Sequence, residues 1–332
     1  MIAERARSRT RGPPNAEARR QRNAMEASAP RQHARRRRPH ISNALAVLSG
    51  GKSLISEKSL FAAVAYLLLP ERLRLLPIVD VGTHYGLDLT IPAAQHGHRV
   101  YAYEPTPSVY NELVTNMRRK NLTSTRSIEF FHGRVGKEGL RRQVLLRPVA
   151  VSNTTGVANL TTSWAYSGVA NTLSGPAGLP PSYVSMPGTF VKTLRVNTVR
   201  LSDELAPEKD GVFLLKIDAQ GHELHVLRGA EEYIRSHDVY VILLEFSPFL
   251  LKAAHVDPME LLTLLTVDLG YQCFDGRRLQ SRGFVHRERD TLSMTLEQFV
   301  AAYSAETTKK KRFGEWTDLL CVRLDLLRRR RR

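Results

Sequence analysis

The sequence predicts a doubly wound α/β domain whose sheet is mostly parallel, with an antiparallel strand at one edge. From about residue 77 of its 332 residues, short apolar runs alternate with segments of helical periodicity. The runs VFLLKI and VYVILLE are apolar almost throughout, as in strands that are covered on both faces. Strands that alternate with helices in this way form parallel sheets with helices on both sides.

The individual elements follow from these patterns in chain order. Strands are predicted over 77–81, 99–103, 128–132, 147–151, 212–217, 239–245 and 318–324. Helices are predicted over 84–96, 107–120, 223–236 and 258–268. Pro92 should kink or shorten the first helix, whereas Pro107 suits the first turn of the second. Residues 158–190 are rich in Gly, Pro, Ser and Thr and lack periodicity, which predicts a long loop that helps to shape a binding pocket.

The positive charge is concentrated at the two ends of the chain. The formal net charge is +17, but residues 1–40 contain twelve Arg and three Glu, and residues 328–332 are all Arg. Residues 41–327 therefore carry only about +3. Such runs are typical of disordered, solvated tails, with organelle targeting as the first alternative and nucleic-acid binding as the second. The expected organisation is a basic tail over 1–40, a helical extension over 41–76, a catalytic domain over 77–327 and a second basic tail over 328–332.

The two cysteines and the longest apolar segment bear on the compartment. Cys273 and Cys321 lie in the apolar contexts YQCF and LLCV, which predicts reduced core residues and a cytoplasmic protein. The apolar run over residues 59–69 is too short to span a bilayer and is expected to be a buried helix. No set of His, Cys and Asp has metal-ligand spacing, so no metal is predicted. Oligomeric state is left open.

The stretch PIVDVGTHYG, residues 77–86, joins the first predicted strand to the first helix. Gly82 and Gly86 allow a tight turn and a close approach of the backbone to a ligand. In open α/β folds ligands bind at this carboxyl edge of the sheet, where the strand order reverses. Asp80, at the end of the strand, can accept hydrogen bonds. Glycine turns of this kind also serve simple packing, so this stretch alone leaves both interpretations open.

A second acidic residue follows the next predicted strand. Glu104 ends the stretch VYAYE, twenty-four residues after Asp80, where a carboxylate can hold two ribose hydroxyls. A dinucleotide site would need Gly-x-Gly-x-x-Gly, but His84 and Leu87 stand where its second and third glycines would fall. The pattern therefore favours a cationic sulfonium cofactor, S-adenosylmethionine, over a nicotinamide dinucleotide.

A third cluster lies in LLKIDAQGHELHVLRGAEE, residues 214–232. Asp218 ends a predicted strand at the same edge, and His222 and Glu223 follow on one short turn. Titratable groups that converge in a cleft are what acid–base chemistry requires. The competing interpretation makes Asp218 a helix cap and Glu223 a partner of the helix dipole. Within the same fold as the cofactor signature, the functional interpretation is preferred, and Asp218, His222 and Glu223 are the candidate catalytic residues.

These motifs occur in order with VAVSN at 149–153 and VILLEFSP at 241–248. Together they resemble the FkbM-type methyltransferases over about residues 77–274. The resemblance implies a Rossmann-like methyltransferase fold, S-adenosylmethionine as cofactor and, usually, O-methylation. It also implies that the turn from Asp80 through Gly82 and His84 to Gly86 faces the methionine end of the cofactor and Glu104 the ribose, with Val149, Ala150 and the residues up to Ser152 near the adenine.

The sequence departs from the usual family pattern, and alternatives follow. Thr83-His84 replaces Ala-Asn after the first glycine, and Ala219-Gln220-Gly221 replaces Val-Glu-Gly after Asp218. The expected activity is methyl transfer to a hydroxyl of a small molecule or saccharide. One alternative is a nucleic-acid methyltransferase, although the Asn-Pro-Pro-aromatic motif that would stack a flipped base is absent after the strand. The other is a non-catalytic binding module.

Overall fold

The computed structural model describes residues 76–126, 143–165, 168–173, 190–275, 295–304, 316–323 and 326. The chain divides into two compact units, residues 1–39 and 40–332, and the first lies wholly outside the described residues. The two basic tails, the extension up to residue 75 and the strand predicted at 128–132 also lie outside them. The fold described below is therefore that of the second unit alone.

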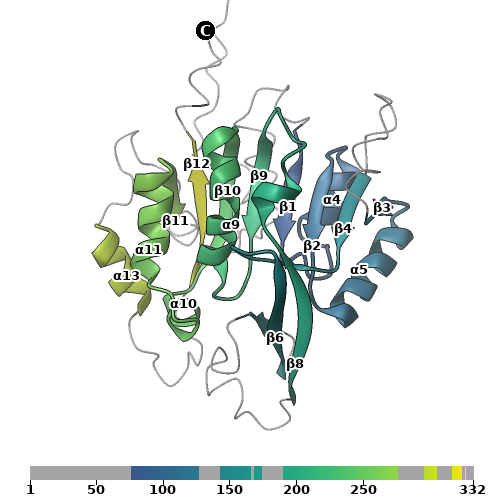
Figure 1. Ribbon diagram of the computed structural model, residues 1–332, viewed down its shortest axis with the longest axis horizontal. Coiled ribbons are helices and arrows are strands. Elements are labelled where there is room, and N and C mark those ends of the chain that lie inside the picture. The colour runs from purple at the N-terminus through teal and green to yellow at the C-terminus, as the bar shows by residue number, and fades with distance from the viewer. Residues whose placement is uncertain are drawn as a thin grey trace, which may run out of the picture. The chain divides into compact units, whose positions relative to one another are not determined.

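An eight-stranded sheet forms the centre of this unit (Figure 1). All strands are parallel except β12, which pairs antiparallel with both of its neighbours. The predicted mostly parallel sheet is thus confirmed, but the antiparallel strand lies next to the edge and not at it. In sheet order the strands are β11 (Gln272–Asp275), β12 (Thr317–Val322), β10 (Val239–Phe246), β9 (Val212–Ile217), β1 (Ile78–Val81), β2 (Val100–Tyr103), β4 (Gln143–Arg147) and β3 (Thr123–Thr125).

Helices cover both faces of this sheet, as a doubly wound fold requires. Val79 and Val81 of β1 pack in one core cluster with α9, α11 and α13, whereas Ile78 packs in another with α4 and α5. Figure 1 shows the first group along β9 to β12 and the second beside β2 to β4. The helices are α4 (Thr90–Gln95), α5 (Pro107–Arg119), α8 (Leu201–Glu204), α9 (Glu223–Ser236), α10 (Pro248–Ala253), α11 (Pro258–Thr263), its π-helical continuation η3 (Leu264–Asp268) and α13 (Leu296–Ser304).

Two predicted elements are shorter or divided in the structure. The first helix was expected over 84–96, but α4 begins only at Thr90, after a series of turns. The strand expected over 147–151 is two strands, because β4 ends at Arg147 and β5 (Ala150–Val151) belongs to a second sheet. Pro148 separates them, and a residue without a backbone N–H cannot continue a ladder on both sides.

The prediction of a loop over 158–190 is wrong for much of that segment. Residues 156–165 form β6 (Gly156–Ala165) and residues 168–172 form β7 (Gly168–Thr172), in a four-stranded sheet of order β5-β8-β6-β7 with β8 (Phe190–Val199). β6 pairs antiparallel with β8 from Gly156 to Trp164, and in Figure 1 these two strands extend below the main sheet. Pairing with a strand that is distant in the sequence can outweigh a weak local preference for strand. This is why the residue pattern alone did not predict these strands. Residues 174–189 lie outside the described part.

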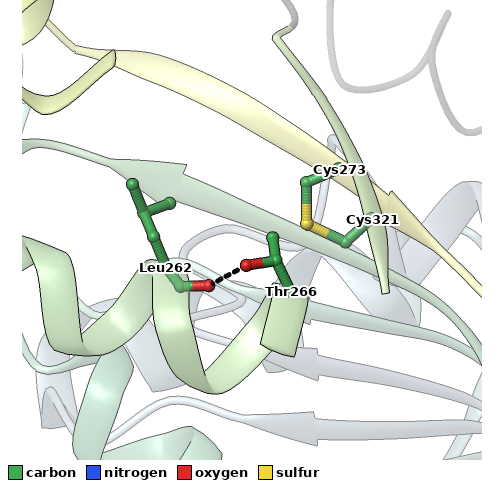
Figure 2. The surroundings of a disulfide bond; sticks show 4 residues. All are labelled: Leu262, Thr266, Cys273 and Cys321. Carbon is green, nitrogen blue, oxygen red and sulfur yellow. Dashed lines mark hydrogen bonds between the residues drawn. A yellow bond between two sulfur atoms is a disulfide. The ribbon is translucent and has the colours of Figure 1, made fainter. Parts of the chain in front are cut away.

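The prediction of reduced cysteines is also wrong. Cys273 of β11 and Cys321 of β12 lie directly opposite each other and form a disulfide across 48 residues of sequence (Figure 2). Both are buried, in one core cluster with Leu262 at the end of the helix shown in Figure 2. There Thr266 donates a hydrogen bond to the Leu262 carbonyl at 2.7 Å. The disulfide removes the sequence-based reason for expecting a reducing compartment. Within the described residues no helix is both long and apolar enough to cross a membrane.

Candidate functional site

A pocket opens where the carboxyl ends of β1, β2 and β9 meet, beside the start of the second sheet. The chain leaves β1 toward β2 on one side and leaves β9 toward β10 on the other, so this edge is the point where the strand order reverses. Such crevices are where open α/β sheets bind ligands. The pocket is lined by Val81, Gly82, His84, Tyr103, Glu104, Pro105, Val149, Ala150, Val151, Leu160, Leu173, Asp218, Ala219, Gln220 and His222.

Gly82 is required by the contact between two neighbouring loops. Its φ is +73°, and a Cβ built on it would lie 1.9 Å from the carbonyl oxygen of Asp218. The Asp218 N–H in turn donates to the Val81 carbonyl at 3.1 Å. The loops after β1 and β9 therefore touch through their backbones, and only a residue without a side chain fits between them.

Glu104 follows β2 and is buried at the wall of the pocket. Its carboxylate accepts the backbone N–H of His84 at 3.1 Å and that of Thr106 at 2.8 Å. Burial raises its pKa to about 7, although these hydrogen bonds lower it. His84 adopts a φ of +51°, which turns its N–H toward this carboxylate. Each carboxylate oxygen keeps a further lone pair that can accept from a ligand hydroxyl.

Asp80 and Gly86 lie behind the pocket and do not line it. The Thr90 hydroxyl donates to Oδ2 of Asp80 at 2.6 Å, but Oδ1 is buried and accepts no hydrogen bond. Burial raises the pKa of Asp80, and the nearby Lys216 opposes that rise. Gly86, with a φ of +71°, faces Leu113 of α5, so its role is in packing the turn against that helix.

Lys216 is a functional candidate that the sequence analysis did not identify. It is the last residue but one of β9 and is buried. Its Nζ donates to the Gly82 carbonyl at 3.0 Å and lies 3.6 Å from Asp80 Oδ1 and 3.5 Å from Asp218 Oδ2. It thereby connects the glycine turn to the loop after β9. A lysine inside an otherwise apolar, doubly covered strand is the signal that could have identified it, because buried lysines need a partner.

Asp218 is the predicted catalytic residue that is most open to the pocket. Its side chain is 31% exposed, and its Oδ1 accepts a hydrogen bond from Gln220 Nε2 at 2.9 Å. Gln220, with a φ of +51°, also donates from Nε2 to Glu245 Oε2 at 2.8 Å. Glu245 lies on β10, the strand next to β9. It is a second residue that the sequence analysis left without a role.

Glu223 is turned away from the pocket and toward the backbone of its own loop. It is buried and absent from the pocket lining, and its Oε1 accepts the N–H groups of Ala219 at 3.1 Å and Gly221 at 3.0 Å. Burial raises its pKa to about 7. The carboxyl group thus fixes the shape of the loop that presents Asp218.

His222 lines the pocket but is engaged on one ring nitrogen. Its Nε2 lies 3.0 Å from the hydroxyl oxygen of Ser152, and its ring stacks on that of His225 with centroids 4.3 Å apart. Burial lowers the pKa of His222 to about 3, so the ring is neutral near neutral pH. The Ser152 hydroxyl donates to Asn153 Oδ1 at 3.2 Å, so a neutral His222 can donate its Nε2–H to the Ser152 oxygen, which leaves this nitrogen occupied.

Part of the pocket lining is apolar. Val149, Ala150 and Val151 come from the start of the second sheet, and Leu160 and Leu173 come from β6 and the end of β7. The predicted positions Val149 and Ala150 therefore do border the pocket. A lining that combines apolar side chains with polar groups suits a ligand with one aromatic and one polar part. Within the described ranges no cluster of three or more His, Cys, Asp or Glu side chains could hold a metal ion.

Comparisons with known proteins add a family and one solved structure. The model of the methyltransferase FkbM domain matches residues 80–273. No curated protein matches the sequence. The chain is similar, at 11% identity and a TM-score of 0.36, to an O-methyltransferase from Bacillus cereus whose crystal structure was determined in complex with SAH. That similarity covers 85% of this chain and 90% of the other.

Proposed function

This chain belongs to the FkbM methyltransferase family and is an S-adenosylmethionine-dependent methyltransferase, and on that premise we propose that it methylates a hydroxyl oxygen of a small molecule or saccharide. The observation that carries the proposal is that Glu104 and Asp218 line one pocket together with apolar residues. We assign one carboxylate to the ribose of the cofactor and the other to the acceptor.

The residues present fit S-adenosylmethionine, which when bound supplies a methyl group on a positively charged sulfur. Glu104 retains acceptor capacity toward two ribose hydroxyls. The wall that includes Val149 and Leu160 is suited to the adenine. Asp80 does not line the pocket, and its Oδ1 lies 3.6 Å from Lys216 Nζ, so we assign it to holding the turn after β1 rather than to a direct contact with the methionine end.

Asp218 is the group we assign to the acceptor. In the transfer, an oxygen lone pair of the acceptor forms the new bond to the methyl carbon, and the electrons of the old carbon–sulfur bond remain on sulfur. The hydroxyl proton passes to a carboxylate oxygen of Asp218, which is exposed to the pocket and held by Gln220 and Lys216. Glu223 is engaged by two backbone N–H groups and His222 by Ser152, so neither is as available.

The pocket favours an uncharged acceptor over a nucleic acid. The described residues that line it include no Lys or Arg, whereas Glu104 and Asp218 are acidic. Proteins that bind nucleic acids neutralise phosphates with basic side chains at the contact surface. An anionic backbone would be repelled here, while a hydroxylated, neutral molecule would not.

The test is methyl transfer from labelled S-adenosylmethionine to a panel of hydroxylated small molecules and saccharides, followed by mass spectrometry. Labelled ether products would support the proposal, and label on nucleic acid alone would refute it. Calorimetry with S-adenosylhomocysteine separates binding from catalysis. Glu104→Ala should weaken that binding by roughly 10-fold or more, since hydrogen bonds to a charged group contribute about 1.5–3 kcal/mol each. Unchanged affinity would remove Glu104 from the site, and binding without any transfer would leave a binding module.

A further inference from the structure

One amide nitrogen bridges two carboxyl groups beside the pocket. Gln220 Nε2 donates to Asp218 Oδ1 at 2.9 Å and to Glu245 Oε2 at 2.8 Å. An amide nitrogen has two hydrogens, and here both are committed to carboxyl oxygens. The two accepting oxygens therefore lie within about 6 Å of each other. In this chain a neutral donor therefore lies between the two carboxyls.

Two carboxyl groups this close in a poorly solvated site do not both ionise readily. The Asp218 side chain is 31% exposed, and Lys216 lies 3.5 Å from its Oδ2. Glu245 does not line the pocket, and it is the member of the pair on which a proton is expected.

The groups around Glu245 agree with this distribution. Asp318 of β12 is its direct neighbour across the antiparallel ladder, and Asp218 and Glu223 come from the loop after β9 and the start of α9. Burial first, and then the charges of Asp218, Glu223 and Asp318, raise the pKa of Glu245 well above its usual range. Lys216 of β9 pairs with Leu243 of β10, two residues before Glu245. Its Nζ is directed to Gly82, Asp80 and Asp218.

We propose that Glu245 holds a proton at neutral pH beside Asp218, and that Gln220, whose amide nitrogen donates to both carboxyl groups, links the two. Glu245 is a positioning residue, because it acts through Asp218 and does not line the pocket. Its proton leaves Glu245 uncharged, so that it adds no second negative charge beside the carboxyl that faces the acceptor. The catalytic meaning of the pair rests on the proposed function, whereas the proton on Glu245 does not.

The experiment is a pH titration of the full chain labelled with carbon-13 at the glutamate carboxyl carbons, followed by NMR. The Glu245 signal is the one that is missing from the spectrum of Glu245→Gln. We expect it to titrate well above the value of about 4.3 that is usual for glutamate. In Asp218→Asn the midpoint should fall by more than about one pH unit, because strongly coupled carboxyls shift one another by that amount.

Asp318→Asn is the matched control, since it also removes one neighbouring carboxylate but does not line the pocket. In that variant the midpoint of Glu245 should fall by less. If Asp218→Asn does not fold, Gln220→Ala keeps the test open, because loss of the donor should raise the Glu245 midpoint further. The proposal is overturned if the midpoint of Glu245 in the wild type lies near the usual value for glutamate. It is also overturned if neither Asp218→Asn nor Gln220→Ala changes that midpoint. Transfer of the labelled methyl group is measured separately. The titration can therefore support the protonated Glu245 even if no methyl transfer is found, and methyl transfer can be found even if Glu245 titrates normally.

Discussion

Asp218 and Glu223 lie five residues apart on one loop, but their carboxyl groups have different surroundings. That of Asp218 is open to the pocket, whereas that of Glu223 is buried and bound by the N–H groups of Ala219 and Gly221. Chemistry needs a group that the acceptor can reach, and a stable loop needs buried donors that are satisfied. The two carboxyls divide these tasks.

The first prediction separates the two roles. Asp218→Asn should lower turnover by about 10²–10⁴-fold, the usual loss of a general base, with little change in melting temperature. Glu223→Ala should instead leave two buried N–H groups unsatisfied, at about 1–3 kcal/mol each, and lower the melting temperature. Turnover with the acceptor found by labelled transfer and thermal unfolding are measured on both variants. A collapse of turnover in a Glu223→Gln variant, with Asp218→Asn still active, would exchange the two assignments.

The second prediction concerns the contact at Gly82. A methyl group in Gly82→Ala would lie 1.9 Å from the Asp218 carbonyl oxygen, so the two loops must separate. We expect a loss of about 1–3 kcal/mol from overpacking, added to the cost of a positive φ, and loss of S-adenosylhomocysteine binding. Gly97→Ala is the matched control, because its φ is +90° but nothing lies within 4 Å of the added carbon. Equal effects in the two variants would show that only backbone strain matters.

At the scale of elements, the antiparallel strand β12 is held between β10 and β11 by a ladder on each side. The disulfide adds a covalent link between β11 and β12 and closes a loop of 48 residues. Part of that loop lies outside the described residues. Closing a long loop restricts the unfolded chain, so the link is expected to raise the free energy of unfolding of the domain.

The third prediction follows from that link. Reduction of the Cys273–Cys321 disulfide should lower the free energy of unfolding by about 2–4 kcal/mol, as for a loop of several tens of residues. The measurement is thermal unfolding with and without dithiothreitol, with alkylation and mass spectrometry to confirm the redox state. The double variant Cys273→Ser/Cys321→Ser is the control and should not respond to the reductant. An identical melting temperature for reduced and oxidised wild type would contradict the expectation.

For the whole molecule, burial at the site couples folding to pH with two opposite signs. The folded pKa of Glu223 is about 7, above its ordinary 4.5, so its stabilising contribution is present below pH 4.5 and lost as the pH rises through 7. The folded pKa of His222 is about 3, below its ordinary 6.5, so its contribution is present above pH 6.5 and lost as the pH falls toward 3.

The fourth prediction uses variants that keep the shape but not the ionisation. The free energy of unfolding of wild type minus that of Glu223→Gln should fall between pH 4.5 and 7, by up to roughly 3 kcal/mol. The same difference for His222→Gln should rise from about pH 3 to 6.5. Urea unfolding at a series of pH values measures both. Slopes of the same sign in the two differences would contradict these burial effects.

Much of the site could be predicted from the sequence because its residues follow apolar runs. β9 occupies residues 212–217, as predicted, and Asp218 therefore lies at its carboxyl end. Glu104 was placed by the same reasoning after β2. Local order along the chain was enough here, since a strand buried on both faces shows itself in composition and the next residue must lie at the edge.

The remaining features depend on which strands become neighbours. The bridge from Gln220 to Glu245 needs β9 beside β10, the contacts of Lys216 need β9 beside β1, and the disulfide needs β12 between β10 and β11. The sequence by itself determined the fold class, the family and the carboxylates that end the strands, because these depend on local patterns. Only the tertiary structure decided the partners of each carboxylate, the antiparallel pairing of β6 with β8 and the disulfide between the two cysteines. Pairing and register between segments tens of residues apart arise from the packing of the whole sheet, and no local pattern encodes them.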